Sequence, residues 1–140
     1  MHRFASCQQV PANHPPCVYY LADPRTPNSP RYVGASARLA ERLKSHHKAS
    51  VHRTDDHARW WRALYADGLR PVLCVVQSFA SLEEATRAEW RIAQRWQRYG
   101  VALFGSHVAP AVDAVLVSAS MGCEGPRRAL RASRRAMVAA

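Results

Sequence analysis

One glutamate interrupts the apolar stripe of a helix that the sequence predicts from Ser81 onward. Apolar residues at three- and four-residue intervals define the inward-facing side of this helix: Leu82, Ala85, Ile92, Trp96 and Tyr99. Glu89 falls within the same stripe. A carboxylate there has to be paired or bind a metal, because an isolated buried charge is very unfavourable. Glu89 is therefore either half of a structural salt bridge to an arginine or part of a functional site.

A polar ridge is predicted on an earlier helix. Arg38, Arg42 and His46 are spaced i, i+4 and i+8, so they line one side of a helix whose apolar stripe is Leu39 and Leu43. Arginine forks suit phosphate groups. A solvated charged face is the more common explanation of such a ridge, and by itself it identifies no activity.

The order of predicted elements is β-β-α-α-β-α, which indicates an α/β fold with a small three-stranded antiparallel sheet flanked by helices. Segments 17–22 and 31–34 are predicted to form a hairpin around the proline-rich turn at 23–30. Their tyrosines are Tyr19, Tyr20 and Tyr32, which as strand aromatics can simply fill the core. Segment 71–79 is apolar on both alternating faces, as in a strand covered on both sides.

The helix boundaries are predicted from capping residues. The first helix starts near Ser36, whose hydroxyl can cap it. The second ends at Gly68, and its start can be capped by Thr54, Asp55 or Asp56. It carries an apolar side made of Ala58, Trp61, Leu64 and Tyr65. The third opens with a capping box formed by Ser81 and Glu84.

The composition favours a globular protein with a polyanionic partner. The chain has 140 residues, 48% of them hydrophobic, and a net charge of +10 carried almost wholly by arginine. A basic protein without a nucleic-acid role is the alternative. No apolar run is long enough for a membrane span or resembles a signal peptide, so we expect a cytoplasmic protein with no membrane partner. The four scattered cysteines are expected to be free thiols; a zinc site using Cys7, His14 and Cys17 would lack a fourth ligand.

Three zones divide the chain. Residues 1–16 are predicted to be an irregular arm, residues 17–100 the folded domain, and residues 101–140 an extension with an arginine-rich tail. As a helix, the tail would present a cationic face suited to nonspecific binding of a nucleic-acid backbone; as a frayed terminus it would simply be solvated. The candidate backbone-binding residues on the first helix and the tail are Arg38, Arg42, Lys44, Arg127, Arg128 and Arg131.

Taken together, these features resemble the signature of the GIY-YIG nuclease family. The resemblance consists of Val18-Tyr19-Tyr20, then Tyr32-Val33-Gly34, then Arg42, then Glu89, in the order and approximate spacing of that family. It covers roughly residues 17–100. The family's two tripeptides lie on the first two strands, and its glutamate lies on the third helix.

Two further stretches support the resemblance, and several positions depart from it. Segment 57–76 is similar to the family's second helix and third strand, and the Ala-x-x-x-Glu pattern selects Glu89 over Glu83 and Glu84. The family's first glycine is Val18 here, and Ala35 replaces a lysine that some members carry. No asparagine follows Asn28, although the family often has a late one, for which Ser118 is only a weak replacement.

The resemblance implies a metal-dependent endonuclease that hydrolyses phosphodiester bonds in DNA. Glu89 would hold one Mg²⁺ (or Mn²⁺), and Arg42 would clamp the scissile phosphate. Tyr20 or Tyr32 would orient or deprotonate the attacking water. His46 would support a tyrosine or bind phosphate, together with His57 or, less well placed, His52.

Two other functions are compatible with the sequence. The missing asparagine and Val18 are compatible with a degenerate, non-catalytic nucleic-acid-binding module. A protein-interaction domain is a further alternative, with a partner surface made of Trp60, Trp61, Trp90 and Trp96, although the helical spacing of Trp61 and Trp96 fits a core better. A monomer is taken as the default oligomeric state.

Overall fold

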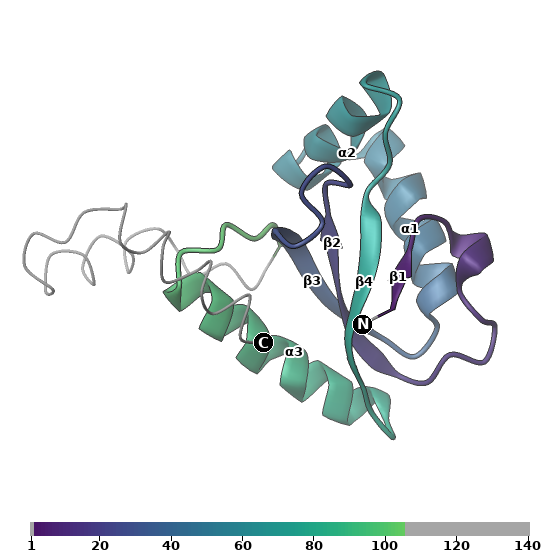
Figure 1. The fold of residues 1–140 in the computed structure, drawn as a ribbon, viewed down its shortest axis with the longest axis vertical. Helices are drawn as coiled ribbons and strands as arrows, with labels where there is room; N and C mark the ends of the chain where they lie inside the picture. The colour runs from purple at the N-terminus through teal and green to yellow at the C-terminus, as the bar shows by residue number, and fades with distance from the viewer. Residues whose placement is uncertain (1, 106–140) are drawn as a thin grey trace, which may run out of the picture.

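The structure, a computed structural model, describes residues 2–105 and has an α/β architecture (Figure 1). Along the chain the elements are β1 (Arg3–Phe4), the 3-10 helix η1 (Cys7–Gln9), β2 (Cys17–Ala22), β3 (Pro30–Ser36), α1 (Leu39–His52), α2 (Asp56–Ala66), β4 (Val72–Ser78) and α3 (Leu82–Arg98). The predicted α/β class is confirmed. No helix within the described range is long and apolar enough to cross a membrane.

The sheet has four antiparallel strands in the order β1-β4-β2-β3, so the prediction of three strands is wrong. The additional strand comes from the segment predicted to be an irregular arm. Arg3 pairs with Cys74 and Phe4 with Leu73, along the edge of β4 that β2 leaves open. A two-residue strand carries no alternating pattern, and only this pairing with β4 reveals it.

β2 is the central strand between β3 and β4, and all six of its residues are buried. Because side chains alternate across a strand, Tyr19 and Tyr20 point to opposite faces of the sheet. Tyr19 pairs with Gly34 of β3, and Leu21 pairs with Tyr32. Tyr19 and Tyr32 therefore share one face.

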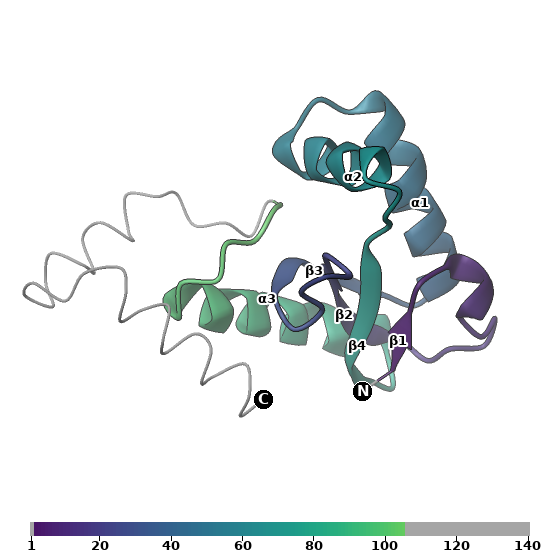
Figure 2. The same ribbon diagram turned by 45° about the horizontal axis from the view of Figure 1, so that its top comes forward.

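Helices cover both faces of the sheet. Figure 2 shows α1 and α2 on one side of the strands and α3 on the other. Tyr19 and Leu21 pack in the core beneath α1 and α2, with Leu39, Leu43 and Trp61. Tyr20 packs in the second core, which includes Ala85, Ala88, Ala93 and Trp96 of α3. β2 thus contributes to two separate cores.

The helix ends follow the predicted chemistry in two helices and depart from it in one. Asp55 caps α2 by accepting a hydrogen bond from the Ala58 amide (2.9 Å), and Ser81 caps α3 by accepting from the Glu84 amide (3.2 Å). Gly68 follows α2 with a φ of 71°, as expected of a left-handed residue. α1 instead begins at Leu39, because Ser36 is the last residue of β3; its hydroxyl accepts from the Arg38 amide (3.0 Å).

The predicted stripe of α3 is correct in its centre and wrong at its ends. Ala85 and Trp96 are buried, and Glu89 is buried among them at 8% exposure. Leu82 and Tyr99 are 46% and 36% exposed. Leu82 is the first residue of α3 and Tyr99 its C-cap, so both lie at the ends of the packed face.

The cysteines described by the structure are free thiols. Cys17 and Cys74 are buried, Cys7 is half-buried, and Cys123 lies outside the described residues. Burial raises the pKa of Cys17 to about 11. The prediction of free thiols is confirmed for these three described cysteines.

Gly34 provides the space in which the two site tyrosines meet. A Cβ at this position would lie 2.7 Å from Tyr19 Oη and 3.0 Å from Tyr32 Cε1. Tyr19 is fully buried and cannot move aside without disturbing the core.

We therefore expect Gly34→Ala to lower the free energy of unfolding, measured by urea denaturation, by about 1–3 kcal/mol, as overpacking does elsewhere. Gly68→Asn, in open space at a φ that asparagine tolerates, is the control and should unfold close to wild type. A wild-type midpoint for Gly34→Ala would contradict this account.

Candidate functional site

The centre of the candidate site is an arginine that joins two tyrosine hydroxyls. Arg42, in the first turns of α1, donates from Nε to Tyr19 Oη (3.3 Å) and from Nη2 to Tyr32 Oη (3.3 Å). Tyr19 comes from β2 and Tyr32 from the neighbouring β3. Their rings lie 6.3 Å apart. The Arg42 side chain thus extends from α1 onto the sheet face that these two strands share.

Two histidines complete the cluster. His46, one turn beyond Arg42, places Nε2 2.7 Å from Tyr19 Oη and its ring edge-on against Tyr32. His57, from the first turn of α2, stacks on Tyr32 with a centroid separation of 4.7 Å and an interplanar angle of 9°. The His46 and His57 centroids are 5.5 Å apart. Four predicted site residues therefore come together: Tyr32, Arg42, His46 and His57.

The hydrogen bonds assign a tautomer to His57. The indole Nε1 of Trp61 donates to His57 Nε2 at 3.0 Å, and because indole only donates, this nitrogen must be an acceptor. Tyr19 Oη accepts from Arg42, so its own proton is available for His46 Nε2. His57 therefore carries its single proton on Nδ1, and His46 does the same when Tyr19 donates to it.

Burial keeps both histidines neutral. It lowers the pKa of His46 to about 3, with the positive charge of Arg42 contributing, and the pKa of His57 to about 4, against an opposing effect of Asp55. Protonation of His57 would also remove the acceptor for Trp61. The two imidazoles are therefore uncharged hydrogen-bonding groups at neutral pH.

The charge of the cluster resides on Arg42. Burial lowers the pKa of Arg42, but the hydroxyls of Tyr19 and Tyr32 outweigh it and raise that pKa above its usual value. The pKa of Tyr19 is raised well above the usual range of a phenol, mainly by burial and then by the charge of Tyr32, against the lowering effect of Arg42. Tyr19 is consequently a protonated phenol, held between a cation and a neutral imidazole.

Tyr20, predicted as a site residue, does not join this cluster. It lies on the opposite face of the sheet, edge-on to Trp96 of α3 at 5.8 Å, and its hydroxyl donates to the Pro27 carbonyl (2.8 Å). The alternation of side chains along β2 is the physical reason, since Tyr19 occupies the face toward α1. Tyr19 therefore takes the position that the sequence interpretation gave to Tyr20.

Glu89 lies outside the cluster and affects it through its negative charge. It is buried on α3, across the sheet from α1 and α2, and it does not line the cavity described below. Its negative charge is nevertheless among the influences that raise the pKa of Tyr19, after burial and Tyr32. A carboxylate that acts on the Tyr19 phenol lies within electrostatic reach of the site.

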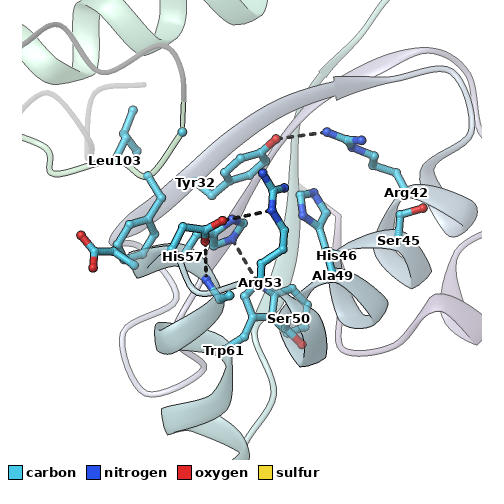
Figure 3. Close-up of a pocket in the computed structure, with 15 residues that line it drawn as sticks. Tyr32, Arg42, Ser45, His46, Ala49, Ser50, Arg53, His57, Trp61 and Leu103 are labelled. Atoms are coloured by element: carbon cyan, nitrogen blue, oxygen red, sulfur yellow. Dashed lines mark hydrogen bonds and ion pairs between the residues drawn. The ribbon is translucent and has the colours of Figure 1, made fainter.

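A cavity of about 720 Å³ opens beside the arginine (Figure 3). Its walls come from α1, from the 53–56 loop, from the start of α2 and from residues 103–105. Figure 3 shows Tyr32 and Arg42 at one end and His57, Arg53 and Trp61 around the interior. The cavity and the tyrosine–arginine cluster are thus contiguous.

Residues 101–105, which the sequence assigned to the C-terminal extension, reach the site. Phe104 forms an isolated parallel bridge with Tyr32, and its amide donates to the Arg31 carbonyl at 2.7 Å. Its ring lies 5.4 Å from His57 at an interplanar angle of 17°. The Arg31 guanidinium lies over the same ring, 4.7 Å from the centroid of Phe104. The folded unit therefore continues past residue 100.

The remaining backbone-binding candidates are either on the surface or outside the described range. Arg38 is solvent-exposed and pairs with Glu41 at 3.5 Å, and Lys44 is exposed on α1. The tail residues Arg127, Arg128 and Arg131 lie outside the described residues, as does Ser118. Among the members of this set that the structure describes, Arg42 alone enters the cluster.

The donor atoms fit a hard cation better than zinc. Among residues 2–105 no group of three or more histidine, cysteine or acidic side chains gathers as a metal-binding set, so the sequence suggestion of zinc at Cys7, His14 and Cys17 gains no support. Mg²⁺ commonly uses one or two carboxylates and several waters. A single buried carboxylate within reach of the site is compatible with that requirement.

Sequence reasoning missed three residues that shape the site: Tyr19, Trp61 as a hydrogen-bond donor, and Phe104. The segment 17–22 is apolar throughout, so its pattern cannot tell which tyrosine faces α1. The four-residue spacing of His57 and Trp61 on one helix was a usable signal for their contact. Phe104 has no periodic neighbours that would have marked it.

Comparisons with protein-family models, with curated proteins and with solved structures each found no match.

The neutral histidines make the fold sensitive to acid. Because the pKa of His46 is lower in the folded state than its ordinary 6.5, the unfolded chain binds more protons between about pH 6.5 and pH 3. Stability contributed by neutral His46 is present above pH 6.5 and is lost as the pH falls through this window, by up to about 1.4 kcal/mol per pH unit.

His46→Gln should show a shallower decline of the unfolding free energy in urea titrations between pH 7 and pH 4.5. His52→Gln, an exposed histidine of the same helix, should keep the wild-type slope; equal slopes in all three proteins would refute the assignment.

Proposed function

We propose that the chain is a divalent-metal-dependent endonuclease of the GIY-YIG type that hydrolyses phosphodiester bonds in DNA. The observation that carries this proposal is the bridge from Arg42 to the hydroxyls of Tyr19 and Tyr32, with His46 on Tyr19. The first tripeptide of the resemblance then begins one residue earlier, as Cys17-Val18-Tyr19 in place of Val18-Tyr19-Tyr20. In this alignment both signature tyrosines lie on one sheet face, one on each of two paired strands.

Arg42 can bind a phosphate without giving up its contacts to the tyrosines. A guanidinium has five N–H donors, and the two phenols use only two of them. The planar fork suits two phosphate oxygens at once. Because Arg42 lies at the rim of the cavity, its remaining donors are placed where a nucleic-acid backbone can reach them. Arg42 would therefore hold the scissile phosphate and offset its charge as it becomes more negative.

Tyr32 supplies the hydroxyl that would orient the attacking water. It lines the cavity and accepts a hydrogen bond from Arg42, whereas Tyr19 is fully buried. The raised pKa of Tyr19 makes that phenol a poor base. Tyr19 joins Arg42 to His46 Nε2, 2.7 Å away, so the two would hold Arg42 in position beside the phosphate. Tyr19 and His46 would thus act as positioning residues.

Glu89 is the residue that would hold the metal. When bound, Mg²⁺ or Mn²⁺ supplies Lewis-acid stabilisation of the leaving oxygen and of the charge on the phosphoryl group. The burial of the Glu89 carboxylate and its place in the signature that the sequence resembles support this assignment. DNA as the substrate rests on the net charge of +10 and on the resemblance.

One observation favours a second candidate, a non-catalytic nucleic-acid-binding module. Within residues 2–105 Glu89 has no companion side chains that would complete a three-ligand metal set. A protein of this kind would use Arg42 and its basic surface to bind DNA and would leave the strand intact. Metal-dependent cleavage separates the two candidates.

Removal of the Glu89 charge should abolish cleavage. We expect wild-type protein to nick or linearise supercoiled plasmid with Mg²⁺ and to leave it intact with EDTA, and Glu89→Gln to be at least about 100-fold slower, as expected for loss of a metal ligand. Glu83→Gln, on the exposed side of the same helix, is the matched control and should cut normally. Circular dichroism verifies folding. Cleavage by Glu89→Gln at the wild-type rate would refute the metal assignment.

The neighbouring tyrosines provide a second test. Tyr19→Phe should lower the rate of plasmid nicking by about 100-fold, because it removes the hydroxyl that joins Arg42 to His46 and so misplaces the phosphate clamp. Tyr20→Phe changes hydrogen bonding on the other face of the sheet, including the bond to the Pro27 carbonyl, so it should lose about 1 kcal/mol of stability and retain activity. The opposite ranking of the two variants would indicate that the site lies on the α3 face of the sheet and would contradict the assignment of Tyr19.

A further inference from the structure

Five of the fifteen residues that line the cavity beside Arg42 carry aromatic rings, and the cavity is larger than a single phosphate needs. Its volume is about 720 Å³, and its ring-bearing walls are Tyr32, His46, His57, Trp61 and Phe104. His46 lies nearly parallel to Trp61, at 6.2 Å and 15°, and His57 nearly parallel to Tyr32. The α1 wall contributes small side chains, Ser45 and Ala49, which leave the interior open. The rings of each pair stack on one another, and the space beside them is large enough for a planar ring.

The interior of the cavity differs from its rim in charge. Burial holds His46 and His57 in their neutral forms, so neither supplies a positive charge. Arg53, the cation on the loop side, is paired with Asp55 at 3.1 Å. Arg42 supplies the positive charge at the end next to Tyr32. An anionic group is therefore favoured at the rim, and an uncharged group is favoured inside.

Polar groups at the loop side can contact the edge of such a ring. The Asp55 side chain accepts from the Ala58 amide and pairs with Arg53, so both side chains are held in place on the cavity wall. Carboxylate and guanidinium groups are the partners that base edges use in nucleic-acid recognition. Ring walls, a polar edge and a neighbouring phosphate clamp are together the features of a nucleotide site.

We infer that this cavity receives one unpaired nucleobase of the nucleic acid whose backbone Arg42 holds. The inference rests on the proposed function and narrows its substrate class to DNA with an unpaired nucleotide beside the bound phosphate, such as a bulge, a flap or a single strand. A base inside a continuous duplex would have to unpair and unstack before entering, whereas an unpaired base avoids much of that cost. Stacking on aromatic side chains then favours the bound state without requiring a particular base.

Binding of three matched DNA hairpins tests the inference. The hairpins carry a 5′-fluorescein label and share one sequence; the first is fully paired, the second has one unpaired thymidine, and the third has an abasic nucleotide in place of that thymidine. Fluorescence anisotropy with wild-type protein in EDTA measures binding without cleavage. We expect the hairpin with the unpaired thymidine to bind at least ten-fold more tightly than the other two. Equal affinities for all three would overturn the inference, and so would tight binding of the abasic hairpin, which would indicate recognition of a flexible backbone only.

Variants that fill the cavity locate the effect. Ser45→Trp and Ala49→Trp each place a ring inside the cavity, and both should lose the preference for the unpaired thymidine while retaining the affinity of wild type for the paired hairpin. Ser45 is exposed, so Ser45→Trp tests the cavity even if Ala49→Trp fails to fold. Ala63→Trp, at an exposed position of α2 away from the cavity, is the control and should keep the preference. Retention of the preference by a folded Ser45→Trp would place the base elsewhere and overturn the inference.

The two proposals fail in different ways. Metal-dependent cutting of the paired and unpaired hairpins at equal rates, with equal affinities, would support the nuclease and refute the base-binding cavity. Selective binding of the unpaired thymidine without cutting of any hairpin in Mg²⁺ would support the cavity and refute the nuclease. Absence of binding to all three hairpins would overturn both.

Discussion

The double-sided burial of β2 is the constraint on which the rest of the structure depends. A strand in the middle of a sheet, covered by helices on both faces, has to place consecutive side chains in different cores. Tyr19 and Tyr20 are the consequence: the first meets α1 and α2, and the second meets Trp96 of α3. Gly34, directly opposite Tyr19, has no side chain, so the phenol can lie against its backbone. The site thus occupies space that the sheet itself provides.

Burial also determines the charges of the site. The same packing that fixes Tyr19 and His46 keeps the phenol protonated and the imidazole neutral, because water no longer stabilises their charged forms. Arg42 retains its charge through two phenol hydroxyls. Its positive charge is therefore concentrated at the boundary between the cluster and the cavity, where the proposed phosphate would bind. The neutral rings behind it give the cavity a different chemical preference from its rim.

Parts that are distant in the sequence cooperate to form the cavity. α1 contributes Arg42 and His46, α2 contributes His57 and Trp61, and the segment after α3 contributes Phe104. The parallel bridge between Phe104 and Tyr32 ties the last described residues to β3. Phosphate binding, positioning of the attacking water and base binding are proposed for adjoining surfaces of this one assembly, so a change in the position of any of the three segments would affect more than one of them.

The sequence by itself determined the features that depend on local chemistry. Caps at Asp55 and Ser81, the left-handed Gly68, the burial of Glu89 and the ridge of Arg42 and His46 follow from contacts within a few residues or from helical periodicity. Tertiary structure decided the features that depend on pairing and facing. A uniformly apolar strand has no pattern that distinguishes its two faces, so only packing selected Tyr19 over Tyr20. β1 is too short to show alternation and exists because β4 offers an open edge, and Phe104 joins the site only because the chain returns to β3 after α3.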